Sequence, residues 1–124
     1  PIRFTGFLNQ SSLPAAYSAV DVIVLPSNSN ETWGLVINEA MLSGLPALVS
    51  DQVGCGPDLI VSGQTGDIFP MGDVEKLSAL MIEYAADPVR LESMRSKSRE
   101  RILDGYSTEQ AVNGVLSALK RVVR

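Results

Sequence analysis

Short apolar runs punctuate the first seventy residues and predict buried strands. The runs DVIVLP at 21–26 and PALVS at 46–50 have consecutive apolar side chains, which is typical of parallel strands buried on both faces. GDIFP at 66–70 predicts a shorter strand, and IRFTG at 2–6 has the same β-like composition. The chain is therefore expected to contain four short strands.

Helical spacing separates these runs. Ser12 is a candidate N-cap for a helix over roughly 13–19, since proline at position 14 is tolerated in a first helical turn. A second helix is expected from about Gly34, and Gly44 stands where a left-handed cap would end it. Pro57 opens a third, short helix that runs through Val61.

Beyond Asp73 the pattern becomes entirely helical. Asp73 is expected to cap a first amphipathic helix, Asp87-Pro88 to start a second, and Ser107 to cap a third. The apolar positions assigned to the three helices are Leu77, Leu80, Met81 and Tyr84 in the first, Met94 and Ile102 in the second, and Ala111, Val115, Leu116, Leu119 and Val122 in the third.

Strands that alternate with helices predict an α/β fold: a Rossmann-like parallel sheet flanked by helices and joined by right-handed crossovers. In such sheets a ligand binds beyond the carboxyl ends of the strands, at a topological switch point. The loops after 21–26 and after 46–50 are both polar, glycine-bearing and at carboxyl ends. The sequence therefore predicts a ligand site between these two loops.

The composition of the chain argues against several classes of partner and site. The 124 residues carry a net charge of −4, so no basic stripe is present for nucleic acid. Histidine is absent, which removes the commonest general base and most zinc sites. A lone Cys55 excludes a disulfide framework and favours a reducing compartment, and no apolar run reaches the length of a transmembrane segment. We therefore expect a cytoplasmic location, with peripheral membrane association of a longer protein as the alternative.

The stretch NETWGLVINEA at 30–40 combines a helix start with two acids. The amides of Gly34 and Leu35 should lack intrahelical partners and, with the helix dipole, suit phosphate oxygens. Glu31 and Glu39 cannot bind phosphate, but carboxylates accept hydrogen bonds from sugar hydroxyls. Glu39 would lie roughly 6–7 Å along the helix axis. A sugar nucleotide has this layout of sugar, diphosphate and ribose.

The wider stretch resembles a known family. FTGFL, LPAAYSAVDVIVLPS and NETWGLVINEAMLSGLPALVSDQVGCGPDLI are similar to the carboxyl-terminal donor-binding domain of group 1 (family-four) retaining glycosyltransferases of the GT-B fold. Glu31 and Glu39 match the E-x7-E spacing of that family. The resemblance is close over residues 3–73 and looser over the helical tail. It implies one domain over 1–124, with a nucleotide-sugar donor-binding core at 1–73 and carboxyl-terminal helices at 74–124.

The resemblance also implies a role for each matched residue. Glu31 would act at the donor sugar beside the transferred anomeric carbon and is the residue assigned to catalysis, and Glu39 would hold the ribose. The segment Trp33, Gly34 and Leu35 would meet the sugar and diphosphate through its amides, and Ser27 belongs to the strand-end Pro-Ser before the donor loop. Such enzymes transfer a hexose with retention from a nucleoside-diphosphate sugar, the co-substrate, without a required cofactor or metal.

The family comparison further implies partners outside this segment. The basic pair that neutralises the diphosphate and the amino-terminal acceptor domain would lie upstream of residue 1, so that the sheet here is a truncated GT-B domain. An isolated segment of this kind is expected to be inactive. It is also expected to self-associate, through an edge strand or through the apolar stripe of the last helix.

Two other classes compete with this hypothesis. A non-catalytic nucleotide-sugar-binding or scaffold module of Rossmann-like fold would share the same site, and only the upstream sequence would distinguish it. A flavodoxin-like signalling domain would need an acidic pocket at the end of the first strand, and IRFTG offers none. The plainer interpretation of Trp33 is a packing residue, and that of Cys55 is a small loop residue.

Overall fold

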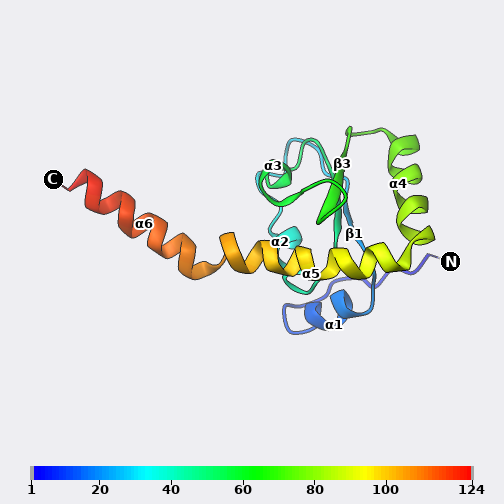
Figure 1. Cartoon of the computed structure of the whole chain (residues 1–124), viewed down its shortest axis with the longest axis horizontal. Coiled ribbons are helices and arrows are strands. Elements are labelled where there is room, and N and C mark those ends of the chain that lie inside the picture. Colours follow the sequence, from blue (N-terminus) through cyan, green and yellow to red (C-terminus); the bar gives the residue numbers. More distant parts are fainter. Residues whose placement is uncertain (1, 124) are drawn as a thin grey trace.

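A computed structural model describes residues 2–123. Three parallel strands, β1 (Ile23–Leu25), β2 (Ala47–Ser50) and β3 (Gly66–Phe69), form one sheet in the order β1-β2-β3. The helices among them are α1 (Leu13–Ser18), α2 (Leu35–Leu42), α3 (Gly56–Leu59), α4 (Val74–Ala86), α5 (Pro88–Gly105) and α6 (Thr108–Val122). The predicted α/β fold with a parallel sheet flanked by helices is confirmed (Figure 1).

The continuous apolar run at 46–50 contains the central strand, β2. All four residues of β2 are buried, because the strand has a neighbour on each side and helices on both faces. Val24 pairs with Leu48, and Leu48 pairs with Asp67 of β3. The edge strand β1 is only half-buried.

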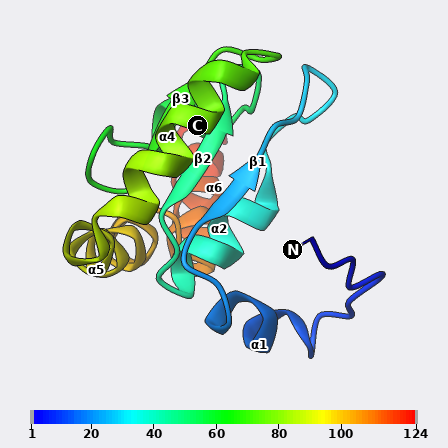
Figure 2. The ribbon, with the colours of Figure 1, turned by 90° about the vertical axis from the view of Figure 1, so that its right-hand side faces the viewer.

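Alternate side chains of β2 enter two different cores. Ala47 and Val49 belong to a cluster with residues of α2 and α3. Leu48 faces the other way, into a cluster with residues of α4. Figure 2 shows α2 and α4 on opposite sides of the strands. The helix α5 runs across the sheet, so that Met94 packs in the α4 cluster and Ile102 in the α2 cluster, both inward-facing as predicted.

The helix ends are fixed largely by the residues that the sequence predicts. Gly44 has φ +88°, and its N–H donates to the carbonyl of Met41 (2.9 Å) while that of Leu45 donates to the carbonyl of Ala40 (3.0 Å), which together form a Schellman cap. The Asp73 carboxylate accepts from the amide of Lys76, and Ser107 forms a capping box with Gln110.

Near the amino terminus one prediction is wrong and another is confirmed in part. Residues 2–6 form no strand, and Phe4 is 95% exposed, because no strand of the described chain lies beside them to pair with. Ser12 is the N-cap residue of α1 as predicted, but its side chain makes no capping bond, since its hydroxyl and its amide both donate to the Asn9 side-chain oxygen. The described sheet therefore has three strands where four were expected.

The last helix stands apart from the body. No residue of α6 is buried, and the helix extends away from the sheet beyond the end of α5 (Figure 1). Its predicted apolar stripe includes Val115, Leu119 and Val122, all of which are exposed. The expectation that this stripe lies exposed in the described chain is confirmed.

Candidate functional site

The two carboxyl-end loops singled out by the sequence lie against each other. The amide of Cys55, in the β2–α3 loop, donates to the carbonyl of Trp33 in the β1–α2 loop at 2.9 Å. The hydroxyl of Ser50 donates to the carbonyl of Ser27, which fixes the start of the first loop to the end of β2. The loops thus form one surface at the carboxyl edge of the sheet.

Two glycines make this close approach possible. A Cβ at Gly54 would lie 1.9 Å from the carbonyl oxygen of Thr32. A Cβ at Gly34 would lie 3.0 Å from Val53 Cγ1, and the φ of Gly34 is +95°. Any other residue at either position would separate the loops or strain the backbone.

The amino terminus of α2 opens onto this surface. Gly34 is its N-cap, and its carbonyl accepts from the amide of Ile37 at 2.9 Å. Within residues 2–123 the amides of Gly34 and Leu35 donate to no protein acceptor, and the first turn holds no acidic residue. The Leu35 side chain is exposed. This helix end therefore offers two free donors together with the positive end of the helix dipole.

Glu31 and Glu39 flank that helix end as the spacing predicts. Glu31 is half-buried in the β1–α2 loop, and its amide donates to the carbonyl of Asn28 at 3.1 Å. Glu39 lies on the second turn of α2. Its carboxylate Oε2 accepts a hydrogen bond of 3.1 Å from the hydroxyl of Tyr17 in α1. Burial, together with this bond to the Glu39 carboxylate, raises the pKa of Tyr17 above its ordinary value, so the phenol remains a donor.

Trp33 packs within the protein. Its ring nitrogen donates to Asn38 Oδ1 at 2.8 Å, and its ring lies 6.4 Å from that of Tyr106 at an angle of 34°. Tyr106 also donates to the carbonyl of Asp58, which follows the β2–α3 loop. This arrangement favours the packing interpretation of the indole, which holds the β1–α2 loop against α2 and Tyr106.

Cys55 is a core residue rather than a nucleophile. Its side chain is fully buried beside the Gly34 carbonyl, and no histidine exists in the chain to activate it. Burial raises the pKa of the Cys55 thiol to about 11. The interpretation as a small loop residue agrees with this burial.

Sequence reasoning missed Tyr17 and Tyr106. Tyr17 meets Glu39 across 22 positions, and Tyr106 reaches Trp33 from the end of α5. No local spacing could pair residues so far apart, because only the packing of α1 and α5 brings them to the loops.

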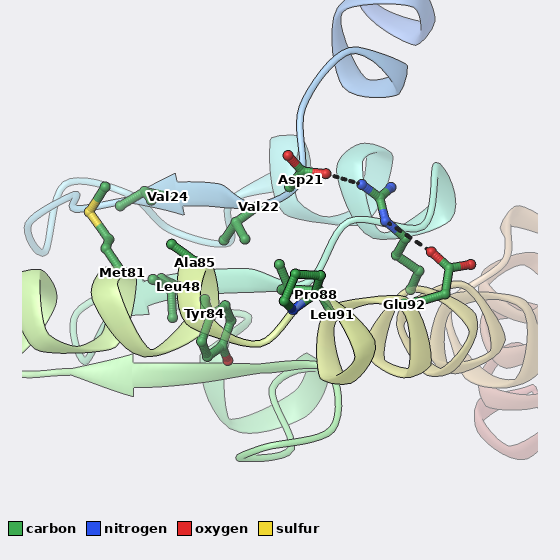
Figure 3. A pocket seen from close by; sticks show the side chains of 11 residues that line it. Asp21, Val22, Val24, Leu48, Met81, Tyr84, Ala85, Pro88, Leu91 and Glu92 are labelled. Atoms are coloured by element: carbon green, nitrogen blue, oxygen red, sulfur yellow. Dashed lines mark hydrogen bonds and ion pairs between the residues drawn. The ribbon is translucent and has the colours of Figure 1, made fainter. Parts of the chain in front are cut away.

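A separate cavity of about 790 Å³ lies on the α4 face of the sheet (Figure 3). Its walls are mainly apolar, with Val22 just before β1, Val24 and Leu48 from the strands, and Met81 from α4. At its rim Asp21 is paired with Arg95 at 2.7 Å. None of its lining residues belongs to the two carboxyl-end loops, so the cavity is not part of the candidate site.

No group of three or more potential metal-ligating side chains gathers within residues 2–123. None of the described helices combines the length and the apolar character that a bilayer crossing requires.

Comparison with known proteins gives a consistent family. Residues 1–101 match the family model described as glycosyl transferases group 1. The chain is 50% identical over 78 residues to the sulfoquinovosyl transferase of Arabidopsis thaliana, which covers 60% of this chain and 15% of that protein. It is 33% identical over 122 residues to a glycogen synthase of Mycobacterium tuberculosis, which covers 96% of this chain and 29% of that protein.

A solved structure agrees with the sequence relatives. The sucrose-phosphate synthase of Thermosynechococcus elongatus superposes with a TM-score of 0.84 and 30% identity, over 98% of this chain and 30% of that chain. The chain thus spans 15% to 29% of the length of the two curated relatives and 30% of the solved one.

Proposed function

This chain belongs to the group 1 glycosyl transferases, and from that premise we propose that it forms the donor-binding half of a retaining enzyme. The enzyme transfers a hexose from a nucleoside-diphosphate sugar to an acceptor. The family is shown by the match to the group 1 glycosyl transferases. The nature of the donor, the retention of stereochemistry and the transfer of a hexose are proposed.

One observation carries the proposal. The free amides of Gly34 and Leu35 lie at a helix amino terminus, between one acid in the loop before it and a second acid on its next turn. A diphosphate bound there would gain two N–H donors and the helix dipole. Hydroxyl-bearing groups on both sides of the diphosphate would each find a carboxylate.

The chemistry assigns a role to each residue. As the bond between the anomeric carbon and the diphosphate oxygen breaks, negative charge grows on the leaving diphosphate, and the amides of Gly34 and Leu35 stabilise it. Glu39 accepts hydrogen bonds from the ribose hydroxyls, and Glu31 accepts them from the donor sugar. The backbone of Trp33 and the strand-end Ser27 complete the wall that faces the donor.

The remaining parts of the enzyme are proposed to lie elsewhere in its polypeptide. No lysine or arginine occurs between Arg3 and Lys76, so the two loops themselves supply no cation to the diphosphate. We assign that counter-charge and the acceptor site to the two thirds or more of the length that the relatives have beyond the matched region. With basic residues in that role and no Asp-x-Asp pair in this chain, transfer is proposed to proceed without a divalent metal.

A non-catalytic nucleotide-sugar-binding module is the second candidate. The same lack of basic residues in the loops favours it, because a binding module needs less stabilisation of a leaving group than an enzyme does. Turnover by the polypeptide that carries this chain distinguishes the two candidates. The enzyme would transfer sugar, whereas the binding module would bind the nucleotide sugar without transfer.

Two measurements test the proposal. Addition of uridine, guanosine or adenosine diphosphate to the labelled chain should move the NMR resonances of the Gly34 and Leu35 amides, with weak affinity and no sugar transfer. The longer polypeptide should transfer hexose from the matching nucleotide sugar, with or without a chelator. Shifts confined to other residues would contradict the site. Binding without any transfer would favour the non-catalytic module, and activity that disappears in a chelator and returns with manganese would contradict metal independence.

A further inference from the structure

One hydrogen bond in the candidate site joins parts of the chain that no motif connects. The Tyr17 hydroxyl donates to Oε2 of Glu39 at 3.1 Å, from α1 to the second turn of α2. The bond leaves Oε1 and the remaining lone pairs of Oε2 without a protein donor among the described residues.

The phenol ring is held by packing, whereas the carboxylate is held by this hydrogen bond alone among the described residues. Tyr17 is 8% exposed and forms a small core with Ala40 and Leu45, against which Leu13 and Ile23 pack. Glu39 is an exposed residue, and its side chain makes no other hydrogen bond within residues 2–123. The tyrosine is therefore the one described contact that selects an orientation for this carboxylate.

We propose that Tyr17 is a positioning residue that fixes the Glu39 carboxylate for the ribose of the donor. This inference rests on the proposed function, since it assigns Glu39 to the ribose. An exposed glutamate loses side-chain freedom when it binds a ligand, and an anchored one has lost that freedom already. Anchoring through Oε2 leaves Oε1 to accept from one hydroxyl of the ribose and a lone pair of Oε2 to accept from the other.

The test compares two ligands in the polypeptide that carries this chain. Calorimetry measures the affinity for a nucleoside diphosphate (uridine, guanosine or adenosine) and for its 2′,3′-dideoxy counterpart, which lacks both ribose hydroxyls. Tyr17→Phe should weaken binding of the ribose form about three- to tenfold, in line with the cost of ordering one side chain. It should leave binding of the dideoxy form unchanged, so that the preference for ribose falls by the same factor.

Tyr84→Phe is a matched control. Tyr84 is also buried, and its hydroxyl donates to a carboxylate, Asp67 Oδ2, at 2.7 Å. This pair joins α4 to β3 on the other face of the sheet, away from both carboxyl-end loops. Tyr84→Phe and Tyr17→Phe should both lower the melting temperature, but Tyr84→Phe should preserve the preference for ribose.

Failure of this inference and failure of the proposed function give different results. If Glu39→Gln leaves the affinity for the ribose form unchanged, Glu39 does not hold the ribose, and both statements fall. If Glu39→Gln weakens ribose binding while Tyr17→Phe does not, only the role of Tyr17 is overturned. Equal weakening of the ribose and dideoxy forms by Tyr17→Phe would also overturn it, because that pattern indicates a structural role.

A measurement on the unsubstituted protein covers the case in which Tyr17→Phe does not fold. The NMR resonance of the Tyr17 ring carbon that bears the hydroxyl reports its hydrogen bond. It should keep its position when the site is saturated with the nucleoside diphosphate. Movement to the position found in Glu39→Ala would mean that the ligand breaks the bond, which would overturn the proposal.

Discussion

At the scale of single residues, the two acids of the candidate site differ in how they are held. Glu31 is half-buried in a loop, whereas Glu39 is an exposed helical residue anchored by Tyr17. The roles proposed for the two acids also differ. A hydrogen bond to the ribose is expected to be equally strong in the ground state and in the transition state. A contact beside the anomeric carbon changes as charge develops there.

Glutamine substitutions should separate these roles in the longer polypeptide. Glu39→Gln should raise the KM for the nucleotide sugar about tenfold, because hydrogen bonds to a charged acceptor are lost, with kcat nearly unchanged. Glu31→Gln should instead lower kcat about tenfold or more, with a smaller change in KM. Steady-state kinetics with the donor varied gives both constants. If both substitutions change KM alike and leave kcat untouched, the assignment of roles is wrong.

Burial of Cys55 predicts slow thiol chemistry. Its folded pKa of about 11 lies above its ordinary value of 9.0, so the folded protein holds the neutral thiol. The stability gained from that preference is fully present below pH 9 and is lost as the pH rises from about 9 to about 11. At pH 8 iodoacetamide should modify the native chain far more slowly than the unfolded chain, as followed by mass spectrometry. Comparable rates in the two states would show that the thiol is accessible.

At the scale of elements, the site depends on how closely two loops approach. The β1–α2 and β2–α3 loops share backbone contacts at Trp33 and Cys55, and the end of α5 supports them through Tyr106. Each loop begins where its strand ends, so β1 and β2 fix the position of the two loops at the edge of the sheet. Gly34 and Gly54 allow the loops to lie in contact. The helix amino terminus proposed for the diphosphate is thus positioned by contacts outside its own helix.

Gly54→Ala should disturb both stability and the site. The new Cβ would meet the Thr32 carbonyl at 1.9 Å, so the backbone must shift, at a cost of about 2–3 kcal/mol in the free energy of unfolding. Denaturant unfolding measures this cost. Gly114→Ala is the control, because no atom lies within 4 Å of its Cβ and alanine favours helix α6 by about 0.5–1 kcal/mol. A neutral Gly54→Ala would show that the loops do not pack as described.

At the scale of the whole molecule, the described chain leaves two kinds of surface without a partner. One is the open edge of an outer strand, because β1 and β3 are each paired with no named strand other than β2. The other is the apolar stripe of α6, where Val112, Val115 and Leu116 line a shallow groove. Exposed apolar surface and open strand edges both favour association.

The 124-residue chain should therefore self-associate as its concentration rises. Sedimentation velocity over a hundredfold concentration range should show a growing share of larger species. Val115→Glu combined with Leu119→Glu should reduce that share, because charges in the exposed stripe oppose burial. Exchange of Glu109 for Gln, on the same helix, provides a control with little effect. A single monomeric species throughout would refute the prediction.

The sequence by itself determined the class of the fold and predicted where the candidate site lies. A short continuous apolar run is typical of a strand buried on both faces, as in a parallel sheet, and β2 lies at the centre of the sheet with all four residues buried. The capping roles of Asp73 and Ser107 could also be predicted from the sequence, because a cap and its partner lie three residues apart. Family motifs located the loops, although the roles of Glu31 and Glu39 stay predictions.

Only the tertiary structure decided what depends on distant neighbours. The run at 2–6 has the composition of a strand, but a strand exists only where another offers it hydrogen bonds, and none of the described strands does. The indole of Trp33 has its partner at Tyr106, and the carboxylate of Glu39 has its donor at Tyr17. Local spacing specifies helices, caps and turns, whereas contacts across 22 or more positions arise from packing. The orientations of the Trp33 and Glu39 side chains are therefore decided by tertiary packing and not by the local sequence.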